Sequence, residues 1–299
     1  MQKIDLKTVL AGAQLPALPQ SAVSILNLSQ DPENGPQEFA APIEADEGLA
    51  CQVLRFVNSS YFGFSGKITS VRLAITMVGV RTIKNFALWS AVFSLLPNPK
   101  YGPFDINRLW QDSLRRALFV RSLSNTLELK NADEGFSAAL LQDMALPILA
   151  KAIPGAYAKL LTAQQRKRVR LSKLEQEVFG WNHAEAAVVL AEQWNLPEHF
   201  AGLIRDHVRP SWKMKEIQSV PECFVVALSS LLPTVTEEGW PEQELFEKRL
   251  AKLQKANVEM LPKLFAEIDK GFEELARILR ISVPDRSMVD YLEPAEAVS

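Results

Sequence analysis

Apolar residues recur at intervals of three or four along nearly the whole chain, and this spacing places them on one face of an α-helix. Leu49, Val53, Phe56 and Val57 show the spacing in one segment, and it starts again at Val71. No segment shows convincingly the alternation of apolar and polar residues that is typical of a half-buried β-strand. The sequence therefore predicts an all-α protein made of many helices joined by short loops.

The composition narrows the classes of function. The chain has 299 residues, of which 47% are apolar and 23% charged, as is usual for a globular protein with a large core. Its formal net charge is -2, so we expect no general attraction to nucleic acid. The longest apolar stretch, residues 86–96, is too short to cross a bilayer, and the N-terminal segment lacks the apolar run of a signal peptide. We therefore expect a cytoplasmic protein with neither a nucleic-acid nor a membrane partner.

Several kinds of site find no support. Cys51 and Cys223 each lie in an apolar stretch, and no C-x-x-C spacing is present, so we expect small buried side chains rather than a disulfide or a thiolate metal site. A phosphate-binding P-loop, a dinucleotide-binding glycine motif and a G-x-S-x-G nucleophile motif are all absent from the sequence. We expect no bound cofactor.

Three motifs carry a resemblance to one family. They are LPALPQSAV at residues 15–23, LACQVLRFVNSSYFGFSGKITSVRLAITMVG at residues 49–79, and GWNHAEAAVVLAEQW at residues 180–194. The first two resemble the opening of the HDOD domains of bacterial signalling proteins, and the third is similar to a later segment of the same domain. The resemblance extends over about residues 15–210. It implies a multi-helix bundle like that of the HD superfamily, with an N-terminal helical group packed on a degenerate HD-like helical core.

The resemblance and the loops suggest a division of the chain. We expect an N-terminal extension at residues 1–14, an HDOD domain at residues 15–215, and C-terminal helices at residues 216–299 that complete the same body. A proline- and glycine-containing loop at residues 97–102 would separate the HDOD domain into an N-terminal part, 15–97, and a degenerate HD-like part, 103–215.

The family relationship raises the question of metal chemistry, because HD and HD-GYP phosphohydrolases are metal-dependent. Their ligands are an upstream His, an adjacent His-Asp pair and a distant Asp. At the matching positions this chain has Asp112 for the upstream His, Gln142 and Asp143 for the pair, and Ser229 or Ser230 for the last Asp. Amide and hydroxyl groups are weak ligands compared with imidazole and carboxylate. The resemblance therefore implies a vestigial site without metal and a protein that is not an enzyme.

Histidines elsewhere leave a second interpretation open. His183 lies in the third family motif, and His207 follows Asp206 where relatives often carry two adjacent histidines. Together with Asp112, Asp143 and Asp206 the two histidines could surround a residual cavity that binds one metal ion weakly or a phosphate. The alternative, which we prefer, is that both histidines are hydrogen-bonded residues of helix ends with no metal.

Local patterns also predict how these segments fold. We expect one helix over residues 136–153, kinked at Pro147. Ser172 with Glu175, and Asn182 with Glu185, have the spacing of capping boxes that begin helices.

Two segments could contact a partner. Tyr61 and Phe62 lie in an aromatic loop, where most such side chains are expected in the core but one exposed ring would suffice for recognition. The second segment is the basic run QQRKRVR at residues 164–170, which is either a solvated surface or a docking site for an acidic or phosphate-rich ligand. Its charged residues are Arg166, Lys167, Arg168 and Arg170.

The sequence thus predicts a non-catalytic signal-transduction module that acts by binding a protein partner. A divergent metal-dependent phosphohydrolase or phosphodiesterase is the first alternative. The second is a sensor of a small anionic ligand, such as a cyclic dinucleotide, in the vestigial cavity. The partner, the pathway and the oligomeric state are not determined by the sequence.

Overall fold

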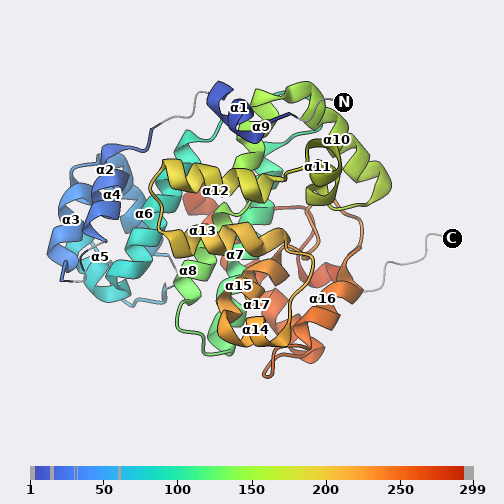
Figure 1. Cartoon of the computed structure of the whole chain (residues 1–299). Helices are drawn as coiled ribbons and strands as arrows, with labels where there is room; N and C mark the ends of the chain where they lie inside the picture. The colour runs from blue at the N-terminus through green and yellow to red at the C-terminus, as the bar shows by residue number, and fades with distance from the viewer. Residues whose placement is uncertain (1–3, 14–16, 30, 32, 60–61, 293–299) are drawn as a thin grey trace. The chain divides into compact units, whose positions relative to one another are not determined.

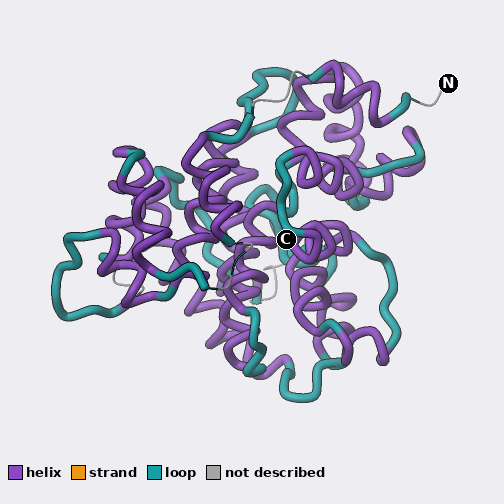
Figure 2. The backbone as a smooth tube through the Cα atoms, turned by 60° about the vertical axis from the view of Figure 1, so that its left-hand side comes forward, coloured by secondary structure: helices purple, strands orange, loops and turns teal. Residues whose placement is uncertain are grey.

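The computed structural model describes residues 4–13, 17–29, 31, 33–59 and 62–292, and within these residues every regular element is a helix (Figure 2). The prediction of an all-α fold is confirmed. No helix of the described part of the chain combines the length and the apolar character that crossing a membrane requires. The chain divides into two compact units, and the domain boundaries expected from the sequence stay predictions.

The smaller unit contains Pro16–Leu95 and Lys270–Val283. Its helices are α2 (Gln20–Leu28), α3 (Pro36–Glu44), α4 (Glu47–Val57), α5 (Val71–Val78), α6 (Val80–Leu95) and the end of α17 (Leu261–Leu279) (Figure 1). Phe56 of α4 stacks on Phe86 of α6 with ring centroids 4.1 Å apart, so aromatic contacts join these two helices. Tyr61 lies outside the described residues, whereas Phe62 is half-buried with its ring edge-on to Phe56 at 5.0 Å.

A side chain closes the loop between α4 and α5. The amide of Asn58 donates to the carbonyl oxygen of Ile68 at 2.7 Å and accepts from its backbone N–H at 2.8 Å. Cys51 of α4 is exposed, so the expectation that it would be buried was wrong. It lies on the outward face of a helix whose buried face is formed by Leu49, Val53 and Phe56.

The larger unit contains Met1–Leu15, Leu96–Asp269 and Pro284–Ser299. Its first elements are α1 (Leu6–Gly12), α7 (Ile106–Thr126), α8 (Ala132–Leu141), α9 (Ala145–Ala152), α10 (Pro154–Lys167) and α11 (Leu171–Phe179) (Figure 1). They are followed by α12 (His183–Gln193), α13 (Glu198–Arg205), η2 (Asp206–Val208), α14 (Met214–Ser219), α15 (Pro221–Ser229) and α16 (Gln243–Leu250). The last are η3 (Val258–Met260), the start of α17 and η4 (Val289–Tyr291).

The core of the larger unit is built around α7, which packs on α8 and α15. Leu114 and Phe119 of α7 are fully buried, as are Val225 and Leu228 of α15. Burial of each such side chain contributes about 1.5–3 kcal/mol relative to exposure. The packing holds α7, the end of α8 and the end of α15 in fixed positions, and these places carry Arg116, Asp143 and Ser229.

Candidate functional site

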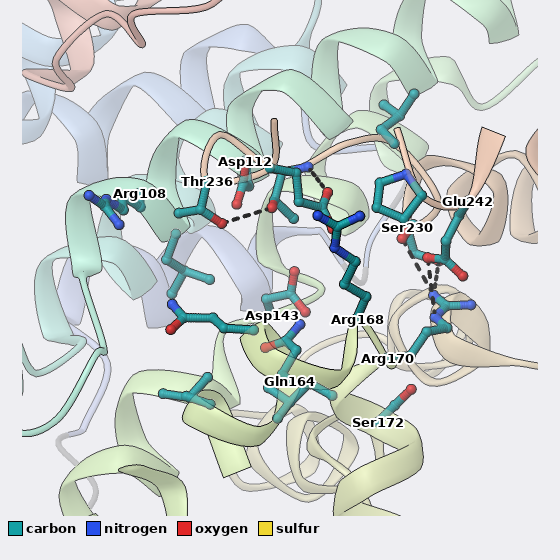
Figure 3. A pocket seen from close by; sticks show the side chains of 18 of the residues that line it. Arg108, Asp112, Asp143, Gln164, Arg168, Arg170, Ser172, Ser230, Thr236 and Glu242 are labelled. Atoms are coloured by element: carbon teal, nitrogen blue, oxygen red, sulfur yellow. Dashed lines mark hydrogen bonds and ion pairs between the residues drawn. The ribbon is translucent and has the colours of Figure 1, made fainter. Parts of the chain in front are cut away.

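A pocket of about 820 Å³ opens in the larger unit. It is lined by α7, the turn after α8, the turn between α10 and α11, and the segment that follows α15 (Figure 3). Asp143, His183 and His207, which are far apart in sequence, all contribute to its lining. Their side chains are buried, so they form an inner wall that is largely withdrawn from solvent.

Asp143 is placed by a break between two helices. The expected single helix over residues 136–153 ends at Leu141, and α9 begins at Ala145, so the prediction of a kink at Pro147 was wrong. Proline has no N–H to donate to the carbonyl four residues earlier, which here is the carbonyl of Asp143. That carbonyl instead accepts from Leu146 N–H at 3.0 Å. The break therefore leaves Asp143 in a turn.

The two histidines are placed by a helix start and a helix end. His183 is the first residue of α12, where Asn182 acts as the N-cap and accepts from the backbone N–H groups of Ala184 and Glu185 at 3.0 and 3.2 Å. The predicted N-cap at Asn182 is therefore confirmed. His207 lies in η2, directly after α13.

The three side chains meet at one point. The Nε2 atom of His183 lies 3.3 Å from Oδ1 of Asp143, and Nε2 of His207 lies 3.4 Å from the same oxygen. The two Nε2 atoms are 3.2 Å apart. One oxygen and two ring nitrogens thus form a nearly equilateral triangle, which we call the donor triangle.

The other ring nitrogen of each histidine has an acceptor. Nδ1 of His207 lies 2.6 Å from the carbonyl oxygen of Ile204, which can only accept, so this nitrogen carries hydrogen. Nδ1 of His183 lies 2.5 Å from Oε2 of Glu175, which also accepts the backbone N–H of His183 at 2.9 Å. With both Nδ1 atoms engaged, both Nε2 atoms face Asp143.

A chain of buried groups extends outward from the donor triangle. The Tyr157 hydroxyl donates to Oε1 of Glu175 at 2.6 Å, and both residues are fully buried. On the opposite side, the Arg116 guanidinium forms an ion pair with Oδ2 of Asp143. Cationic and anionic groups therefore alternate along the chain from Arg116 through Asp143 and His183 to Glu175.

Neighbouring charges determine the protonation of the buried side chains around Asp143. Burial alone would raise the pKa of Asp143, but the Arg116 charge and the hydrogen bond from His183 hold it well below its usual range. Burial alone would lower the pKa of His183, yet Glu175 and Asp143 outweigh it and raise that pKa to about 10. Burial lowers the pKa of His207. The network near neutral pH is consequently electroneutral: Arg116 and His183 are cations, and Asp143 and Glu175 are anions.

The donor triangle also fits a divalent transition ion. Metal–ligand bonds of about 2.0–2.1 Å at tetrahedral angles place neighbouring ligand atoms about 3.3 Å apart, which is the size of this triangle. Two imidazoles and one carboxylate suit Zn, Fe, Mn or Ni. Each donor residue has a second contact that fixes its orientation, as in many metal sites. Glu175 contacts His183, Arg116 contacts Asp143, and the Ile204 carbonyl contacts His207. Asp143, His183 and His207 are the residues that would hold such an ion, in competition with the proton that His183 carries in its absence.

The positions expected for the remaining HD ligands do not join the triangle. Gln142 is fully buried, and its carbonyl oxygen lies 3.5 Å from the hydroxyl of Ser229, while its amide nitrogen has no partner among the described residues. Asp112 accepts from the backbone N–H of Val235 at 2.8 Å on another part of the pocket wall. Burial raises the pKa of Asp112 to about 6, against the opposing effect of the Arg116 charge.

Two further expected positions have other contacts. Asp206 forms an ion pair with Arg205 at 3.1 Å and does not line the pocket. Ser230 donates to the carbonyl oxygen of His207 at 2.8 Å and accepts from Arg170 at 2.6 Å. Sequence reasoning had gathered Asp206 with the two histidines, but the structure brings together only Asp143, His183 and His207.

Three residues of the network were missed from the sequence: Arg116, Tyr157 and Glu175. The capping box expected at Ser172 and Glu175 was wrong, because α11 begins at Leu171 and Glu175 bonds His183 instead. A usable signal was present, since Glu175 follows Leu171 and Leu174 at the spacing of one apolar helix face. A carboxylate on such a face needs a buried partner.

Only part of the basic run lines the pocket, although Arg166, Lys167 and Arg168 are all exposed. Arg166 and Lys167 are exposed at the end of α10 and do not line the pocket. Arg168 and Arg170 do line it, from the turn that joins α10 to α11 (Figure 3).

Comparison with known proteins identifies the family. The HDOD domain pattern matches residues 15–210, which is well over half of the chain. The chain belongs to the HDOD family. A relative from Treponema pallidum, of uncharacterised function, is 25% identical over 194 residues, which are 64% of this chain and 37% of the relative. This chain therefore spans little more than a third of the length of that curated relative.

Solved structures show the same fold. An HDOD domain protein of unknown function from Geobacter sulfurreducens is 20% identical, with a TM-score of 0.67 over 93% of this chain and 100% of its own. A phosphohydrolase candidate from Shewanella amazonensis is 17% identical, with a TM-score of 0.66 over 98% and 99% of the two chains. A signal-transduction candidate from Marinobacter aquaeolei is 20% identical, with a TM-score of 0.61 over 90% and 59%. At these identities the similarity establishes the fold alone.

Proposed function

We propose that this HDOD protein is a non-catalytic regulatory module of bacterial signalling, which acts by binding rather than by turnover. The observation that carries the proposal is the ion pair between Arg116 and Asp143. An HD-type hydrolase uses this Asp to hold a divalent ion, and the ion supplies the charge that makes hydroxide from water. Here an internal guanidinium supplies a compensating charge.

The neighbouring contacts support the same conclusion. Gln142 and Ser229 are both fully buried and face each other. The resemblance matches Gln142 and either Ser229 or Ser230 to ligands of the HD enzymes. Neither an amide nor a hydroxyl offers the negative charge that a hydrolytic divalent ion requires. The side chains of Arg116, Asp143, His183 and Glu175 pair with one another without a metal, which supports a site that needs no ion.

We propose further that the module has a protein partner. The exposed cations Arg166 and Lys167 would favour an acidic surface on that partner. The resemblance to a signal-transduction candidate is compatible with this role. Capture of a partner by the wild-type protein, but not by a variant carrying Arg166→Glu and Lys167→Glu, tests this part of the proposal.

The non-catalytic role is tested by metal content and turnover together. The purified protein is incubated with Zn, Mn, Fe or Ni, dialysed, and assayed for bound metal by mass spectrometry and for cleavage of model phosphodiesters. We expect cleavage at the level of the buffer. Cleavage that Asp143→Asn abolishes and His199→Gln preserves would refute the proposal, because His199 is an exposed histidine outside the pocket.

A metal-dependent phosphohydrolase is the second candidate, and the donor triangle favours it. A bound ion would supply Lewis-acid and hydroxide chemistry. Glu175 and the Ile204 carbonyl would keep both histidine Nε2 atoms directed at the ion. One equivalent of metal, lost in His207→Ala and retained in His199→Gln, together with cleavage would establish this candidate.

A further inference from the structure

The geometry points to an anion-binding subsite on the pocket wall formed by the turn between α10 and α11, and we propose that it binds the phosphate group of a small phosphate ester. The inference rests on the proposed function, because it names a ligand class for a module that acts by binding. It uses none of the three residues of the donor triangle. The residues that carry it are Arg168, Arg170, Leu171 and Ser172.

The start of α11 offers unsatisfied donors. Arg170 is the N-cap residue, and its side chain makes no capping hydrogen bond. Its carbonyl accepts from Lys173 and Leu174 at 3.1 and 3.3 Å, whereas the N–H groups of Leu171 and Ser172 have no acceptor within the described chain. Both residues line the pocket, so the positive end of the helix dipole borders it.

A hydroxyl on the pocket wall, carried by a residue that is otherwise buried, gives the independent sign of a ligand. Ser172 is only 9% exposed, lines the pocket and has no hydrogen-bond partner among the residues that the structure describes. Figure 3 shows Ser172 on the same side of the pocket as Arg170. The hydroxyl is open to the pocket, where an acceptor on a ligand would give it the hydrogen bond that no described residue supplies.

Two arginines add charge at the same turn. Arg168 ends α10 in the left-handed conformation, with φ of 52°, and has no ion-pair partner in the described part of the chain. Its side chain extends into the pocket (Figure 3). Arg170 is anchored by Ser230 Oγ at 2.6 Å and by Glu242 at 3.7 Å, so Glu242 offsets part of its charge. Arg168 therefore supplies the uncompensated cation.

The rest of the pocket indicates the class of ligand. Its volume of about 820 Å³ admits a molecule of nucleotide size rather than a bare phosphate ion. The opposite wall carries the carboxylates of Asp112 and Glu237, which can accept from hydroxyl or amino groups. The subsite thus fits a phosphate ester of a nucleoside or of a sugar, with the phosphate at the α11 end.

Isothermal titration tests the subsite with four probes: inorganic phosphate, adenosine 5′-monophosphate, glucose 6-phosphate and uncharged adenosine. The test variants are Arg168→Gln and Ser172→Ala. The matched control is Lys173→Gln, which removes an exposed charge that is close in sequence but outside the pocket. Thermal unfolding of each variant checks that the fold is retained.

We expect at least one phosphate ester to bind more tightly than inorganic phosphate and adenosine. Arg168→Gln should weaken its binding at least about tenfold, because charge-assisted hydrogen bonds carry this much affinity. Ser172→Ala should weaken it several-fold, and Lys173→Gln should leave it within about twofold. Equal binding by Arg168→Gln and the wild type, equal binding of adenosine and its monophosphate, or no binding of any probe would each overturn the inference.

Chromatography of the ligand after titration separates this inference from the proposed function. Recovery of intact ligand from a protein that binds it supports both. Binding followed by hydrolysis keeps the subsite and refutes the non-catalytic role. Absence of binding together with absence of turnover refutes the subsite alone.

Discussion

Asp112→Asn should stabilise the protein at neutral and alkaline pH, although it removes a group that accepts a hydrogen bond. Burial raises the pKa of Asp112 from its usual 3.8 to about 6, so its ionised form is disfavoured in the folded state. The Asn carbonyl oxygen can still accept from Val235 N–H, which lies 2.8 Å from the carboxylate. The substitution thus changes the charge and keeps the contact.

The size of the effect follows from the pKa difference. The folded state binds the proton more tightly than the unfolded chain, so stability due to this group is present at low pH and is lost as the pH rises through about 6. A difference of about two pKa units corresponds to about 3 kcal/mol at pH 8 and to about 1 kcal/mol at pH 4.5. Part of the side chain faces the pocket, so we expect a net change of about 1–2 kcal/mol between these two pH values.

Urea unfolding at both pH values measures this change. The free energy of unfolding of Asp112→Asn minus that of the wild type should be larger near pH 8 than near pH 4.5. Asp285→Asn, at an exposed position, is the control for loss of one negative charge. A difference that stays constant with pH, or a variant less stable than the wild type at pH 8, would show that burial does not penalise this carboxylate.

Two further substitutions probe the buried network and a third probes Gln142 beside it, each by urea unfolding. Tyr157→Phe leaves Glu175 without its hydroxyl donor and should cost about 1–3 kcal/mol, and an unchanged free energy of unfolding would contradict this. Arg116→Met leaves the charge of Asp143 buried without its cation and should cost about 3–5 kcal/mol, with a loss below 1 kcal/mol as the contrary result. Gln142→Met removes an amide nitrogen that has no partner among the described residues, so stability should be unchanged or higher, whereas a loss above 2 kcal/mol would reveal a missing contact.

Much of the fold was predictable because helix formation is governed by local spacing. The apolar period predicted an all-α protein, and Asn182 predicted that α12 starts at the next residue, His183. The break at Asp143 was misplaced because the effect of Pro147 was expected at the proline itself. Because Pro147 has no N–H, the helical hydrogen bond that is lost is the one to the carbonyl four residues earlier.

The candidate site was less predictable because its contacts join distant segments. The family motifs indicated Asp143, His183 and His207, but no local pattern related them to Arg116 or to Glu175. Glu175 in particular satisfied a capping pattern with Ser172, and only the buried position of its side chain shows that it serves His183 instead.

The amino-acid sequence by itself determined the helical fold and the family, and the resemblance alone implies that Gln142 and Ser229 or Ser230 stand in place of HD ligands. These follow from residue identity and from spacing within a few turns. Only the tertiary structure decided that an arginine neutralises Asp143, that the two histidine Nε2 atoms meet at one oxygen, and that Ser172 faces a pocket. The physical reason is that charge compensation and the desolvation of polar groups depend on distances between segments that no local pattern specifies.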